Sequence, residues 1–219
     1  TVDAVVPAEV KQLVTKIKFF IVENIKTARR FIKKVERSVV IDELTFFVLN
    51  KHTDEKEISG FLKPAIEGND VGIISEAGCP GVADPGAAIV EIAHKKNIQV
   101  IPLVGPSSIL LALMASGMNG QNFVFHGYLP IEKSGRAARI RKIEAQSKKE
   151  NQTQIFIETP FRNNQMMEEL VKSCQPNTKL CVACNITAKS EFIKTQAIAQ
   201  WKSNMPDLNK QPAIFLLYT

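Results

Sequence analysis

The stretch between Ser75 and Gly86 has the residue types of a ligand-binding loop. It reads SEAGCPGVADPG and follows the apolar run Val71–Ile74, which is typical of a buried strand. Glycine lets a backbone approach a ligand closely, and loops at the carboxyl ends of parallel strands expose N–H and C=O groups. A tight structural turn is the alternative, because Asp84 and Pro85 also suit the cap and first turn of a helix. The stretch contains neither a GxGxxG fingerprint nor a GxxxxGK[ST] phosphate loop.

The segment Val104–Ser108 repeats this design. It follows an expected strand, Ile98–Leu103, turns on a Gly-Pro pair and leads into an apolar helix. Ser107 and Ser108 either cap that helix or offer hydroxyl groups to a ligand. Two such loops after neighbouring strands would form two walls of one crevice, which favours a binding site.

The remaining chemical candidates are spread along the chain. Glu158 and Arg162 lie in another strand-to-helix turn, where they either pair with each other or contact a substrate. His52 is a candidate base, but we identify no metal-type cluster and no Ser/His/Asp arrangement around the three His. Cys181 and Cys184 have CxxC spacing without the second pair of ligands that a zinc site needs. A structural role for reduced thiols in a buried strand is therefore favoured.

Alternating strands and helices must position these loops. Up to about residue 120, short connections join expected strands at 19–22, 44–49, 71–74 and 98–103 to helices that begin near 27, 58, 85 and 106. This order predicts a mostly parallel α/β sheet. Beyond it, expected strands at 123–125, 154–157, 179–184, 192–197 and 213–218 accompany helices at 134–150 and 161–174. We therefore expect two α/β domains, 1–120 and 121–219, with a mixed sheet in the second.

The composition is that of an ordinary globular protein and excludes several classes. With 45% hydrophobic and 23% charged residues, the 219-residue chain is not disordered, collagen-like or a disulfide scaffold. No apolar run approaches the ~18 residues of a membrane span. The net charge is +6, and two segments are basic: 11–34 has eight Lys and Arg against one Glu, and 131–150 has seven against three. Such segments either follow a phosphate backbone or are solvated helix faces.

Four motifs in register resemble the tetrapyrrole methylase superfamily. Residues 76–86 resemble its DAGTP…SDPG loop, and residues 101–108, IPLVGPSS, resemble its PLPGP segment. Residues 125–130, FHGYLP, are similar to F-x-G-F-L-P, and residues 156–162, FIETPFR, are similar to FYESPHR. The resemblance runs from about Phe20 to the C-terminus and is strongest to the branch that 2′-O-methylates a cytidine in small-subunit ribosomal RNA.

The resemblance implies a two-domain α/β methyltransferase with S-adenosylmethionine in the interdomain cleft, usually a homodimer. By carry-over, the residues that bind the cofactor are Glu76, Ala77, Gly78, Cys79, Pro80, Ser107, Ser108 and Ile109. Methyl transfer is an in-line displacement from an activated sulfonium, so the protein mainly aligns and desolvates the reactants. A base or charge-stabilising group would assist a hydroxyl acceptor, and the candidates are Glu158, Arg162 and Glu191.

The sequence departs from the family in three places. The family's first strand and its LYLIPTPLGN loop are not found before residue 19, so we expect the native start to lie upstream of Thr1. EDTR becomes ENIK at residues 23–26, and ELTK becomes NITA at residues 185–188.

We expect a cytoplasmic enzyme that acts on RNA or a ribosomal subunit, without metal or membrane. A methyltransferase for a tetrapyrrole or other small molecule and a catalytically silent homologue remain alternatives.

Overall fold

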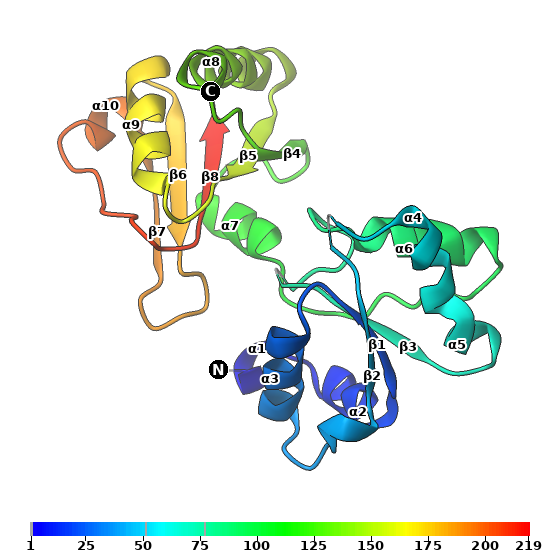
Figure 1. The fold of residues 1–219 in the computed structure, drawn as a ribbon. Helices are drawn as coiled ribbons and strands as arrows, with labels where there is room; N and C mark the ends of the chain where they lie inside the picture. The colour runs from blue at the N-terminus through cyan, green and yellow to red at the C-terminus, as the bar shows by residue number, and fades with distance from the viewer. Residues whose placement is uncertain (1, 51, 77) are drawn as a thin grey trace. The chain divides into compact units, whose positions relative to one another are not determined.

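The chain folds into two compact units, Thr1–Ser107 and Ser108–Thr219, each with its own sheet and core (Figure 1). The computed structural model describes residues 2–50, 52–76 and 78–219. This division differs from the boundary expected at residue 120 by one helix, α7 (Ser108–Ser116). Packing explains the difference, because Ala112 and Leu113 of α7 are buried in a core of the second unit.

Three short apolar strands form the parallel sheet of the first unit, in the order β2-β1-β3. They are β1 (Phe19–Val22), β2 (Thr45–Val48) and β3 (Val71–Ile74), as the apolar runs predict. Alternate residues of β1 enter different cores. Phe20 packs with α2 (Ala8–Lys16) and α3 (Ile25–Val35), whereas Ile21 packs with helices on the other face. The carboxyl ends of all three strands therefore meet at one edge, between two helical layers.

The remaining helices of the first unit are mostly short. They are α1 (Val2–Val5), the 3-10 helix η1 (Ile41–Glu43), α4 (Glu55–Ile58), the 3-10 helix η2 (Ser59–Leu62), α5 (Lys63–Ile66) and α6 (Gly86–Lys95). One helix was expected over residues 58–68, but the structure has separate short pieces there. Pro64 lies in the first turn of α5 and has no N–H to continue a preceding helix.

The strand expected at residues 98–103 is wrong. Residues 98–103 form no strand, although Ile98 and Val100 pack against the core beside α6. Ile101 and Val104 are 67% and 79% exposed. An apolar run forms a strand only if a neighbouring strand shares its hydrogen bonds, and β3 pairs only with β1 in the described residues. The segment instead returns as an irregular connection toward α7.

A mixed sheet of five strands forms the second unit, in the order β4-β5-β8-β6-β7. The strands are β4 (Phe123–Tyr128), β5 (Thr153–Ile157), β6 (Lys179–Cys184), β7 (Phe192–Ala197) and β8 (Ala213–Tyr218). β4 and β5 are parallel, and the other neighbouring pairs are antiparallel. This arrangement confirms the mixed second sheet and places the carboxyl ends of β4, β5 and β6 at one edge.

Helices cover both faces of this sheet. On one face lie α8 (Lys133–Glu150), α9 (Asn163–Ser173) and α10 (Ile198–Trp201), whose core includes Ile140, Met166 and Trp201. On the other face lies α7. In the described part of the chain, no helix is both long and apolar enough to span a membrane.

The CxxC pair lies in a buried strand, as expected. Cys181 and Cys184 are both on β6, three residues apart, so their side chains point to opposite faces. Cys181 belongs to the core beneath α7 and Cys184 to the core beneath α8 and α9. Burial raises the pKa of both thiols. The two sulfurs therefore act as separate packing groups.

Candidate functional site

The loops after β1 and β3 are joined by hydrogen bonds at the carboxyl edge of the first sheet. The backbone N–H of Glu76 donates to Glu23 Oε1 at 2.8 Å, and Thr27 Oγ1 donates to Glu76 Oε1 in a short hydrogen bond. Asn24 accepts from the N–H of Lys26 at 2.9 Å and caps α3. Residues 23–27 therefore fix the position of Glu76, which is exposed.

The two glycine-containing turns adjoin each other within the first unit. Gly78 N–H donates to Ser75 Oγ at 2.9 Å, and Cys79 Sγ donates to the Pro106 carbonyl at 3.4 Å. Gly78 has φ +93°, and a Cβ built there would lie 3.9 Å from the same carbonyl. The turns at 78–79 and 106 therefore face each other, as a shared crevice requires.

Asp84 gives the first loop its shape. Its Oδ1 accepts hydrogen bonds from the N–H groups of Gly81 and Gly86, both at 2.7 Å. A side chain on Gly86 would place a Cβ 2.8 Å from that oxygen. The other oxygen, Oδ2, is buried without a partner among the described residues, and Asp84 lines a small hollow with Ile21 and Ser75. Asp84 thus organises the turn from within, while Gly78 and Pro80 remain exposed.

The predicted cofactor residues are distributed over both units. Ala77 lies outside the described residues. Ser107 ends the first unit, and Ser108 and Ile109 begin the second in the first turn of α7. Ser108 is exposed, whereas the side chain of Ile109 packs against the core beneath α7.

Glu158 and Arg162 pair with each other directly after β5. Arg162 Nη2 lies 2.6 Å from Glu158 Oε1, which also accepts from the Thr159 N–H at 2.6 Å. The Glu158 side chain is 0% exposed and that of Arg162 is 28% exposed. Glu158 Oε2 and Arg162 Nε are buried without a partner in the described part of the chain. The ion pair therefore leaves one buried carboxylate oxygen able to accept a hydrogen bond.

Gln211 connects the loops that follow β5 and β6. Its backbone carbonyl accepts from Asn163 Nδ2 at 2.6 Å, and its Oε1 accepts from Asn185 Nδ2 at 2.8 Å. Next to it, Lys210 N–H donates to the Pro160 carbonyl at 3.0 Å. Sequence reasoning missed Gln211, because a lone glutamine before a strand carries no signal of its own.

Glu191 stabilises its own loop. Its Oε2 accepts from the Thr187 N–H at 2.6 Å, and its backbone N–H donates to the Ala188 carbonyl. Thr187 has φ +67°, a strained conformation that these bonds help to hold. The carboxylate is exposed and makes no contact with Glu158 or Arg162 in the described residues.

His126 lies on β4, the edge strand of the second sheet, and hydrogen bonds to its two ring nitrogens fix one tautomer. Arg139 lies 3.1 Å from its Nδ1, and Gln154 Oε1 lies 2.7 Å from its Nε2. Guanidinium can only donate, so Nδ1 accepts and the proton resides on Nε2. Burial is the main cause that lowers the pKa of His126. The predicted base His52 is exposed, and its backbone N–H donates to Asn50 Oδ1.

Comparison with known proteins defines the class of this fold. The family model of the Tetrapyrrole (Corrin/Porphyrin) Methylases matches residues 10–200, so the chain belongs to the tetrapyrrole methylase family. The crystal structure of the methyltransferase CobJ has the same fold, with a TM-score of 0.64 over 99% of this chain and 89% of that chain, at 17% identity.

Curated relatives carry a more specific name. "Ribosomal RNA small subunit methyltransferase I" of Buchnera aphidicola (subsp. Schizaphis graminum) is 32% identical over 156 residues, which are 70% of this chain and 53% of that protein. The protein of the same name in Escherichia coli O157:H7 is 31% identical over 147 residues, 67% of this chain and 50% of that protein. The chain thus spans about half the length of the curated relatives that it matches.

Proposed function

We propose that the protein is an S-adenosylmethionine-dependent methyltransferase that acts on a ribose 2′-hydroxyl of small-subunit ribosomal RNA. The observation that carries the proposal is the contact between its two glycine-containing turns, Cys79 Sγ to the Pro106 carbonyl at 3.4 Å. These are the turns to which the family resemblance assigns the cofactor. The names of the relatives support ribosomal RNA as the acceptor.

The first loop fits a sulfonium nucleoside because it presents backbone N–H and C=O groups and the fixed carboxylate of Glu76. Gly78 keeps the space beside the Pro106 carbonyl free of a side chain. Glu76, held by Thr27 and Glu23, supplies negative charge that a cationic ligand favours. We assign cofactor binding to Glu76, Gly78, Cys79 and Pro80, with Ser107, Ser108 and Ile109 from the second turn.

S-adenosylmethionine supplies an activated methyl group with a neutral leaving group, so the residues of this chain need only align and activate the acceptor. We assign Glu158 as the group that accepts the proton of the hydroxyl, through its buried and unpartnered Oε2. Arg162 holds Oε1 at 2.6 Å and thereby directs Oε2. Glu191 positions the loop after β6 through the Thr187 N–H.

The cell compartment and the assembly are also part of the proposal. A cytoplasmic homodimer agrees with the family resemblance, and the exposed side chains of Met114 and Phe123, 79% and 39% accessible, offer apolar surface for a contact between copies. Light scattering on the purified protein tests the assembly: a dimer mass is expected, and a monomer at micromolar concentration contradicts it.

Labelled-methyl transfer tests the activity. Protein from the complete reading frame is incubated with labelled S-adenosylmethionine and small ribosomal subunits, total RNA or a metabolite extract. Label in small-subunit RNA, at a nucleotide whose 3′ bond resists alkali, is the expected result. Label only in the metabolite extract would assign a small-molecule acceptor instead. The absence of both label and binding heat with S-adenosylmethionine would favour the silent homologue.

A further inference from the structure

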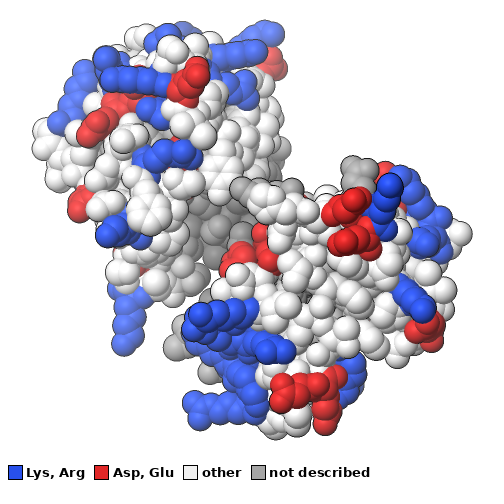
Figure 2. Space-filling model, viewed as in Figure 1, with Lys and Arg blue, Asp and Glu red and all other residues white. Residues whose placement is uncertain are grey.

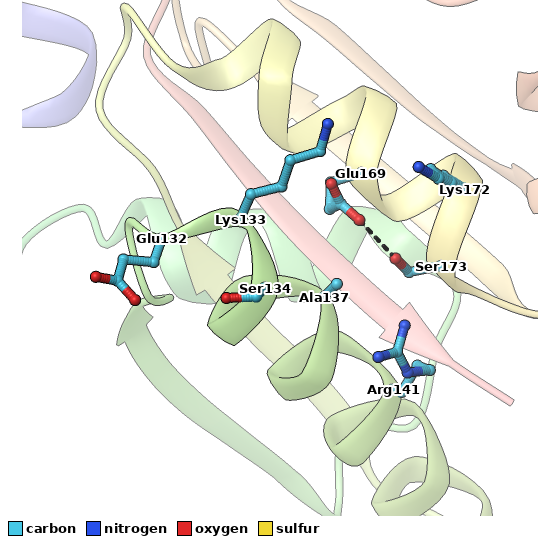
Figure 3. A pocket seen from close by; sticks show the side chains of 8 residues that line it. All are labelled: Glu132, Lys133, Ser134, Ala137, Arg141, Glu169, Lys172 and Ser173. Atoms are coloured by element: carbon cyan, nitrogen blue, oxygen red, sulfur yellow. Dashed lines mark hydrogen bonds between the residues drawn. The ribbon is translucent and has the colours of Figure 1, made fainter.

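A hollow of about 710 Å³ lies between α8 and α9 on the outer side of the second unit (Figure 3). It is lined by Lys133, Ser134, Ala137 and Arg141 of α8, Glu132 just before that helix, and Glu169, Lys172 and Ser173 of α9. Lys133, Ala137 and Arg141 are four residues apart and form one stripe, which lies beside the buried face of α8 that carries Ile140 into the core. The hollow therefore belongs to the surface of the helical layer, and none of the residues proposed for methyl transfer lines it.

Three cations line this hollow without a protein partner. Lys133, Arg141 and Lys172 are exposed, and none of them forms an ion pair or hydrogen bond in the described residues. Other arginines of the same helix are used internally: Arg136 is buried and donates to the Ile131 carbonyl at 3.0 Å, and Arg139 contacts His126. The structure thus separates the cations of α8 into inward and outward groups, which the sequence does not.

The two carboxylates of the lining leave this positive charge in excess. Glu169 is buried, and Ser173 Oγ donates to its Oε1 at 2.8 Å. Glu132 points away from the other lining side chains in Figure 3, while Lys133 extends toward α9. Figure 2 shows many Lys and Arg over the top of this unit, where α8 lies in Figure 1, with several acidic side chains between them.

We propose that this hollow binds the sugar-phosphate backbone of RNA as a contact separate from the methyl-transfer site; this rests on the proposed function. Among the described residues that line it, none has an aromatic or large aliphatic side chain. Stacked bases and bound peptides both need such anchors, whereas flexible Lys and Arg suffice for phosphates. The contact is therefore independent of base sequence. Arg162 precedes α9 and Lys172 lies in its last turn, about 15 Å away along the helix axis, so the hollow is a separate place from the Glu158 carboxylate.

The test is the salt dependence of RNA binding. The double variant Arg141→Gln/Lys172→Gln is compared with Lys148→Gln/Lys149→Gln, which removes the same charge from the last turn of α8, outside the hollow. Fluorescence anisotropy with labelled oligouridylate and oligoadenylate gives log K against log salt. We expect the slope to become shallower by about 1.4 in the first variant, about 0.7 for each lost phosphate contact, for both oligonucleotides. The control slope should change by less than half as much.

The possible outcomes separate this proposal from the proposed function. Equal changes in both variants, or an unchanged slope in the first, overturn the hollow as an RNA site. An unchanged slope together with weaker binding to intact small subunits assigns the hollow to a protein contact and also overturns it. If the expected slope change occurs but the unaltered protein methylates no ribosomal RNA, the hollow stands and the proposed function fails. Circular dichroism of both variants checks that the fold is retained.

Discussion

Removing Arg162 while keeping Glu158 measures what the ion pair contributes to the second unit. In Arg162→Met, the fully buried carboxylate keeps only the Thr159 N–H as a donor. Removing one partner of a buried pair costs about 3–5 kcal/mol, and the 28% exposure of Arg162 admits water, so we expect the lower end, about 3 kcal/mol. In Glu158→Gln/Arg162→Met no buried charge remains at this position, and more than about half of the loss should be recovered.

Trp201 makes this measurement specific to the second unit. It is the single tryptophan of the chain, and it is 1% exposed in the core beneath α8 and α9. Its fluorescence during urea unfolding should show a midpoint lower by about 1–3 M for Arg162→Met, given slopes of about 1–3 kcal/mol per molar urea. Lys172→Met, a surface change on the same helix, is the control and should shift the midpoint little. A loss below about 1 kcal/mol, or a double variant no more stable than the single one, would refute the reasoning.

Three further predictions concern the loop, the thiols and the histidine. Gly78→Ala places a side chain at φ +93° against the second turn, so calorimetry should show weaker S-adenosylmethionine binding. The control is Gly60→Ala, where an added Cβ has no atom within 4 Å and φ is not positive, and this variant should bind normally. Burial raises the pKa of Cys181, so iodoacetamide at pH 8 should label the half-buried Cys79 before Cys181. Mass spectrometry measures the labelling, and equal labelling of the two thiols would contradict the burial of Cys181. Burial lowers the pKa of His126 below its usual 6.5, so this histidine binds a proton more readily in the unfolded chain than in the folded one. The stability of the second unit should therefore fall as the pH drops through about 6.5. His126→Gln should lose less stability over that pH range, and an equal loss would contradict this cause.

Much of the fold follows from local sequence patterns. The runs around Phe20 and Ile73 are apolar on both faces, which suits strands between two helical layers, and all three strands of the first sheet lie where these runs predict. Asn24 lies immediately before α3 and accepts from its first N–H groups. These are contacts between near neighbours, so the sequence contains the necessary information.

Long-range hydrogen bonding accounts for the main error. The run Ile98–Leu103 is mostly apolar, but no strand among the described residues pairs with its backbone groups, and part of it is exposed. Likewise, the sequence could not choose between pairing and substrate contact for Glu158 and Arg162. The structure shows the pair and also the free oxygen that it leaves.

By itself, the sequence determined the family, the two α/β units and the loops that follow their strands, because motif spacing and apolar periodicity are local properties. Tertiary structure alone decided which distant groups meet: Cys79 with the Pro106 carbonyl, and Gln211 with the loops after β5 and β6. It also decided that Arg139 turns inward while Arg141 faces the hollow with Lys172. Two residues apart on one helix differ in direction by about 200°, and only the packing of α8 on its sheet determines which direction is solvent.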